Sequence, residues 1–156
     1  NISTIFDCLI KLKKQAFVLW PNADPGTNKI SEQIRSYREK NNNLPFKFLK
    51  NILPKDFLRL LIFSKCLIGN SSVGIRECSY LGVPVINLGV RQNRRIRGKN
   101  VIDITFNKDQ ILNSIKKQSK VSKYKSEKIY GDGSSGKKIS NLLTKIKLSH
   151  TKTISY

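Results

Sequence analysis

Short apolar runs alternate with segments of helical periodicity along this chain, and this alternation limits the possible folds more than any other feature. The apolar runs are continuous, which is typical of strands in a parallel sheet that helices cover on both faces. We therefore predict an α/β fold with a doubly wound parallel sheet in one Rossmann-like domain. The expected strands are 16–20, 46–52, 66–69, 84–88 and 101–104, and the expected helices are 1–14, 27–40, 56–64, 73–81, 109–118 and 137–148.

The length and composition are compatible with such a domain. The chain has 156 residues, of which 38% are hydrophobic, enough for a core. We expect this domain to cover residues 1–148, followed by a polar C-terminal tail at 149–156. The sequence has no methionine, so we expect a fragment of a longer protein.

No apolar stretch reaches the roughly 18 to 20 residues that span a bilayer, and no signal peptide pattern is visible, so we expect no membrane association. The three cysteines, Cys8, Cys66 and Cys78, are odd in number and lack the spacing of a zinc site. We predict buried free thiols in a reducing, cytoplasmic compartment, without a metal or a cofactor.

The formal net charge of +20 would suit nucleic acid, an acidic membrane surface or an anionic ligand. The lysines are spread along the whole chain, and the few aromatic residues do not alternate with basic ones as they do in stacking platforms. Nucleic-acid binding is therefore kept as a minor alternative.

Gly69-Asn70-Ser71-Ser72 lies between an expected strand and an expected helix. In parallel α/β sheets, ligands bind beyond the carboxyl ends of the strands. Glycine permits a tight bend there, and serine hydroxyls with helix N-terminal N–H groups suit a phosphate. Capping of the helix by Ser71 or Ser72 is the purely structural alternative, and the two roles are compatible.

Glu77 follows on the same expected helix. If Ser72 caps that helix, the capping-box position is Ile75, so Glu77 is too late for this role. A carboxylate at this place can accept hydrogen bonds from both hydroxyls of a ribose, as in dinucleotide-binding folds. The alternatives are a solvated glutamate stabilised by the helix dipole, or an ion pair with Arg76.

Four arginines, Arg91, Arg94, Arg95 and Arg97, follow the expected strand 84–88. Arginine forks match the oxygens of a phosphate in pairs, so this loop favours an anionic ligand. A solvated basic loop or a nucleic-acid contact is the alternative.

Two apparent motifs carry no chemistry. GDGSSGK at 131–137 resembles a P-loop, but Lys138 replaces the magnesium-binding Ser or Thr, so we expect an N-terminal cap of the last helix instead. The only histidine, His150, lies in the polar tail, which argues against a serine hydrolase triad.

Several landmarks occur together in one order from about Phe17 to Leu143. They are Pro21-Asn22-Ala23-Asp24 with Gly26, Ile68 to Ser72 with Gly74 and Glu77, Gly82 to Gly89, Arg91-Gln92 with Arg95 and Gly98, and Tyr130 to Gly133. With these residues the chain resembles the UDP-N-acetylglucosamine 2-epimerases. Asn70-Ser71-Ser72 resembles the hydrolysing branch, which serves sialic acid synthesis. Ile96 and Ser134-Ser135-Gly136 depart from the usual pattern.

The resemblance implies a two-domain GT-B-type fold, in which this chain is the C-terminal domain and holds the nucleotide. It implies that Ser71 and Ser72 bind the diphosphate of UDP, that Glu77 holds the ribose, that Arg91 lies by the nucleotide and that Asn22 reaches the substrate. Catalytic residues are unknown and are expected in the N-terminal domain, which this chain lacks.

The expected reaction converts UDP-N-acetylglucosamine to N-acetylmannosamine and UDP through a glycal, in a homo-oligomeric full-length enzyme. A catalytically inert nucleotide-sugar-binding module is one alternative. The other is an epimerase that acts on another nucleotide-linked N-acetylglucosamine, including a GDP-linked one.

Overall fold

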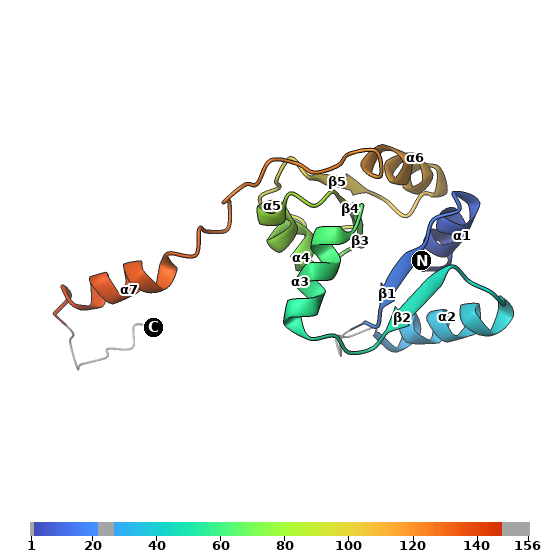
Figure 1. Ribbon diagram of the computed structural model, residues 1–156, viewed down its shortest axis with the longest axis horizontal. Helices are drawn as coiled ribbons and strands as arrows, with labels where there is room; N and C mark the ends of the chain where they lie inside the picture. The colour runs from blue at the N-terminus through green and yellow to red at the C-terminus, as the bar shows by residue number, and fades with distance from the viewer. Residues whose placement is uncertain (1, 22–26, 148–156) are drawn as a thin grey trace, which may run out of the picture.

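Five short parallel strands form the centre of the fold (Figure 1), in a computed structural model that describes residues 2–21 and 27–147. The elements in chain order are α1 (Ile2–Lys11), β1 (Ala16–Leu19), α2 (Thr27–Lys40), β2 (Phe46–Leu49), α3 (Pro54–Phe63), β3 (Leu67–Gly69), α4 (Ser72–Ile75), α5 (Glu77–Leu81), β4 (Val85–Leu88), β5 (Val101–Ile104), α6 (Lys108–Gln118) and α7 (Ser135–Leu143). Every strand pair is parallel, which confirms the predicted α/β class.

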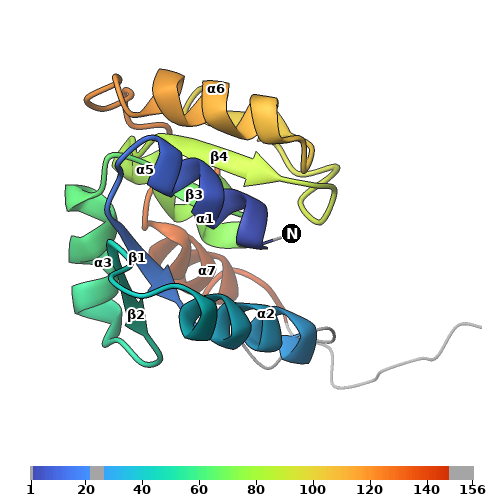
Figure 2. The same ribbon diagram turned by 90° about the vertical axis from the view of Figure 1, so that its right-hand side faces the viewer.

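The sheet β3–β4–β5 is covered on both faces. Its central strand β4 is buried along its whole length. Ile86 and Leu88 pack into a cluster with residues of α1 and α6, while Val85 packs with Leu61 of α3 and Cys78 of α5. Figure 2 shows α6 running along one side of β4, and α1 beside it. Burial on both faces explains why Val85, Ile86 and Leu88 are apolar, while the polar Asn87 on the same strand donates to Asp103 Oδ1.

The pair β1–β2 corrects two predictions. It forms a separate two-stranded sheet, without ladder hydrogen bonds to β3–β4–β5, so the described strands do not form one continuous sheet. The pair is also covered mainly on one face, where Val18 packs against Phe6 of α1 and Ile34 of α2. α1 and α2 both pack on the face of β1 that carries Val18. The opposite face is less covered, so Phe17 on that face is 53% exposed.

The predicted helix 73–81 is in fact two short helices, α4 and α5, that meet at Arg76. Arg76 has a ψ of −73°, which tilts the chain between them. A glycine and two β-branched residues make the first segment a weak helix former. It is held by packing instead: a Cβ at Gly74 would lie 2.9 Å from Val85 Cγ1. The predicted stop at Gly82 is confirmed, with a left-handed φ of 66°.

After α6, an extended segment crosses the edge of the domain towards α7. We call residues 121–131 the strap. Tyr124 N donates to Gly82 O at 2.8 Å, and Glu127 N donates to Ser79 O at 3.1 Å, so the strap is bound to the end of α5. α7 has no buried residue and extends away from the rest of the structure (Figure 1).

α7 begins at Ser135, two residues before the predicted start, and ends at Leu143 instead of 148. The GDGSSGK segment lies at its start, but Ser134 at the N-cap position makes no side-chain hydrogen bond to the helix, so the predicted cap is not formed. Ser134 donates through its N–H, at 3.0 Å, and through its hydroxyl to Asp132. These two hydrogen bonds lower the pKa of Asp132 to about 2. The tail 149–156 lies outside the described residues, so its polar character stays a prediction from the sequence.

Candidate functional site

The serine loop, residues 69–72, follows β3 at the carboxyl edge of its sheet. Gly69 has a φ of 151°, a conformation that side chains rarely adopt. Ser71 caps α4, because its Oγ accepts a hydrogen bond from Val73 N at 3.4 Å, and Ser72 is the first helical residue. The predicted cap is therefore confirmed at Ser71. Ser71 itself is exposed, so its hydroxyl is still accessible to a ligand.

The arginine loop, residues 89–98, follows β4 at the same edge. A turn closes with Asn93 N donating to Val90 O at 2.9 Å, and Arg94 then has a left-handed φ of 66°. Arg91, Arg94 and Arg95 are exposed. Because β3 and β4 are adjacent parallel strands, the serine and arginine loops leave the sheet side by side.

Arg97 has a structural partner. Its Nε donates to Asp103 Oδ2 at 3.0 Å, and Asn87 Nδ2 donates to Asp103 Oδ1 at 2.6 Å. Burial raises the pKa of Asp103, but the hydrogen bonds from Arg97 and Asn87 outweigh it, so the pKa lies below its usual value. Arg97 thus anchors the loop to β4 and β5, and the loop presents Arg91, Arg94 and Arg95 to the solvent.

Gln92 joins the two loops, and the sequence analysis gave it no role. Its side chain is 3% exposed, and its Nε2 donates to the backbone oxygen of Asn70 at 2.7 Å. The only sequence signal was its place in the landmark Arg91-Gln92, because a contact between residues 22 positions apart leaves no periodic pattern.

The strap contacts the arginine loop at Ile96 and the residue after the loop, Lys99. Glu127 Oε2 accepts from Lys99 N at 2.7 Å, and Tyr130 OH donates to Ile96 O at 2.8 Å. Sequence reasoning missed both contacts for the same reason, because they join segments about thirty residues apart.

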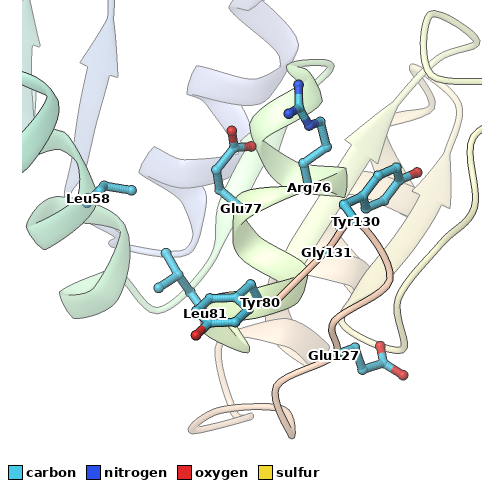
Figure 3. A pocket seen from close by; sticks show the side chains of 8 residues that line it. All are labelled: Leu58, Arg76, Glu77, Tyr80, Leu81, Glu127, Tyr130 and Gly131. Atoms are coloured by element: carbon cyan, nitrogen blue, oxygen red, sulfur yellow. The ribbon is translucent and has the colours of Figure 1, made fainter. Parts of the chain in front are cut away.

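Glu77, the first residue of α5, lines a pocket of about 320 Å³ (Figure 3). The other lining residues are Leu58 of α3, Arg76, Tyr80 and Leu81, with Glu127, Tyr130 and Gly131 of the strap. Among the described residues, the buried Oε2 of Glu77 has no hydrogen-bond partner. The alternative prediction, an ion pair between Glu77 and Arg76, is not observed among the described residues. A buried carboxylate oxygen without a partner is unfavourable unless a ligand supplies a donor.

The structure therefore brings Ser71, Ser72 and the arginine loop together at one edge of the sheet, and places Glu77 a helical turn beyond the serines. Asn22 lies outside the described residues. The roles assigned to these side chains stay predictions.

The three cysteines are free thiols; Cys8 and Cys78 are buried and Cys66 is partly buried. Burial, and then the Glu77 carboxylate, raise the pKa of Cys78 to about 12, and burial raises that of Cys66 to about 11. Within residues 2–21 and 27–147, no group of three His, Cys, Asp or Glu side chains could hold a metal ion. No helix in the same residues is long and apolar enough to cross a membrane.

We expect these thiols to react slowly in the folded protein. A pKa near 12 leaves Cys78 with roughly a thousandfold less thiolate than an ordinary cysteine, and the thiolate is the reactive form. Alkylation with iodoacetamide at about pH 8, followed by mass spectrometry, should label Cys78 rapidly only in denaturant. Labelling of Cys78 in the native protein at the rate of free cysteine would contradict its burial.

The parallel strands, with two loops converging beyond their carboxyl ends, define a Rossmann-like α/β domain of GT-B type. The structure of the Methanocaldococcus jannaschii UDP-GlcNAc 2-epimerase in complex with UDP-GlcNAc and UDP has this fold. It superimposes with a TM-score of 0.70 at 21% identity, over 92% of this chain and 39% of that one.

The chain belongs to the UDP-N-acetylglucosamine 2-epimerase family, whose model matches residues 1–144. It is 32% identical to the UDP-N,N'-diacetylbacillosamine 2-epimerase (hydrolyzing) of Legionella pneumophila, over 95% of this chain and 38% of that protein. It is also 32% identical to the UDP-N-acetylglucosamine 2-epimerase of Neisseria meningitidis, over 74% of this chain and 29% of that protein. The chain thus spans less than half the length of these relatives.

Proposed function

We propose that this chain is the UDP-binding part of a hydrolysing UDP-N-acetylglucosamine 2-epimerase. The observation that carries the proposal is the convergence of two loops with complementary chemistry, one with serine hydroxyls and one with arginines, beyond adjacent parallel strands. The buried, unpartnered oxygen of Glu77 adds a second point of recognition. Together they suit a ligand with a diphosphate and a ribose.

In the proposed reaction, the bond between carbon 1 of the sugar and the UDP oxygen breaks. A proton leaves carbon 2, so that a glycal with a double bond between these carbons remains. Water then adds its hydroxyl to carbon 1 and a proton to carbon 2, which gives N-acetylmannosamine and free UDP. The first step develops negative charge on the departing diphosphate.

The residues of this chain act on that leaving group. Hydroxyls of Ser71 and Ser72 donate to the diphosphate, and exposed arginines, Arg91 in particular, neutralise the charge that develops. Glu77 accepts hydrogen bonds from the ribose hydroxyls, and Asn22 reaches the sugar. The groups that move protons at carbon 2 come from the part of the longer protein that this chain does not span.

Calorimetric titration of the chain with UDP tests the proposal. We expect saturable binding of UDP that excess short duplex DNA does not prevent. Nucleic-acid binding driven by the charge of +20 would instead show a steep dependence on salt. Absence of UDP binding at millimolar concentration, together with salt-sensitive DNA binding, would overturn the proposal.

The base and the sugar are a second question. The relatives include a GDP/UDP-N,N'-diacetylbacillosamine 2-epimerase (hydrolyzing) from Campylobacter jejuni, 35% identical over 69% of this chain and 28% of that protein. Another nucleotide-linked N-acetylated sugar is therefore the alternative substrate, and parallel titrations with UDP and GDP separate the two bases. Product analysis with the longer protein separates an epimerase from an inert binding module. The free thiols fit the cytoplasmic location we propose.

A further inference from the structure

Among the described residues, the side chain of Gln92 forms a hydrogen bond between the arginine loop and the serine loop. The ladder between β3 and β4 ends at the pair Gly69 and Asn87. Beyond that pair, among the described residues, no backbone hydrogen bond joins residues 70–72 to residues 89–95. Beyond the end of the ladder, the 2.7 Å hydrogen bond from Gln92 Nε2 to Asn70 O joins the two loops.

The backbone around Gln92 is shaped to bury this side chain and to expose its neighbours. Arg95 N donates to Gln92 O at 3.4 Å in the turn that precedes Arg97. Gln92 is 3% exposed, while Arg91 and Asn93 on either side of it are exposed. The loop therefore points its arginines outward from a buried, hydrogen-bonded anchor.

Gln118 shows what a purely structural buried glutamine looks like in the same fold. Its Nε2 donates to Val85 O and Asn100 O at 2.9 and 3.0 Å, and its Oε1 accepts from Tyr124 OH at 2.9 Å. Gln92, by contrast, leaves its buried Oε1 without a partner among the described residues. Ser79 Oγ and Asn100 Oδ1 are buried without a partner as well, so the role of Gln92 follows from its hydrogen bond between the two loops and not from this oxygen.

We infer that Gln92 is a positioning residue that holds the serine hydroxyls and the arginines at the spacing a diphosphate requires. The inference rests on the proposed function. Gln92 acts through Asn70, whose carbonyl precedes the Ser71 N–H, and through its own loop, which carries Arg91. Without this link, the β3–β4 ladder still holds the starts of both loops, but the hydrogen bond that joins the loops beyond Gly69 and Asn87 is lost.

Gln92→Met tests the inference, because methionine keeps the shape of the side chain and removes the donor. Calorimetry measures the affinity of the chain for UDP and for uridine, which lacks the diphosphate. We expect Gln92→Met to weaken UDP binding by roughly tenfold and to leave uridine binding unchanged. Gln92→Glu, which replaces the donor with an acceptor facing Asn70 O, should give at least the same selective loss, and serves where Gln92→Met does not fold.

Gln118→Met is the matched control: it should lower the melting temperature without changing the ratio of the two affinities. Equal weakening of UDP and uridine by the Gln92 variants, or unchanged UDP binding, would overturn the inference alone. Absence of UDP binding by the unsubstituted chain would overturn the proposed function and this inference with it.

Discussion

Glu77→Ala is expected to weaken UDP binding by roughly 100-fold while the fold is retained. Two hydrogen bonds from ribose hydroxyls to an ionised carboxylate are each worth about 1.5 kcal/mol. Oε2 of Glu77 has no hydrogen-bond partner among the described residues, so its removal breaks no hydrogen bond of that atom. Calorimetric titration with UDP measures the loss.

Stability provides the second readout for this variant. Because the unpartnered oxygen is unfavourable in the folded state, Glu77→Ala and Glu77→Gln should unfold at the same urea concentration as the unsubstituted chain or a higher one. Glu39→Ala, on the exposed side of α2, is the control for a simple change of charge. Unchanged UDP affinity of the Glu77→Ala variant would show that Glu77 does not bind the ribose. Failure of this variant to fold would show that Glu77 is needed for the structure.

Gly82→Ala is expected to destabilise the protein by about 2–4 kcal/mol. Gly82 has a left-handed φ of 66°, and a Cβ there would lie 2.2 Å from the backbone oxygen of Tyr124. The strap would have to move away, and the hydrogen bond from Tyr124 N to Gly82 O would be lost with it. Urea denaturation followed by circular dichroism measures the change.

Gly136→Ala provides the comparison for Gly82→Ala. Gly136 lies within α7, and a Cβ there would meet no atom within 4 Å. Alanine is favoured over glycine in a helix by about 1 kcal/mol, so this substitution should leave stability unchanged or raise it slightly. Equal changes in the free energy of unfolding for the two substitutions would show that the close approach of the strap does not explain the need for glycine at position 82.

The elements that local pattern determines were predicted well. β5 has the predicted bounds, and α6 begins one residue before its predicted start, because an apolar run and a capping asparagine mark these positions. The break at Arg76 was not predicted, since the apolar spacing of 73–81 continues through it.

For the candidate site, the sequence indicated residues with anion-binding chemistry and missed those that arrange them. Serines after a strand and clustered arginines suggest anion binding through their chemistry alone. The hydrogen bonds of Gln92, Glu127 and Tyr130 join segments distant in the sequence, and nothing in one chain without its relatives marks such pairs. The exposed Phe17 was misjudged because an apolar run does not reveal which of its faces is covered.

The adjacency of β3 and β4 has a consequence for how the binding edge assembles. Both loops come from one strand–helix–strand unit, and the bond between them closes a segment of only 22 residues. The entropic cost of closing such a loop is small and grows slowly with length. The hydrogen bond between the serine and arginine loops therefore costs little chain entropy, because one β3–β4 connection joins them. The two-stranded sheet near the N-terminus contributes no strand to this unit.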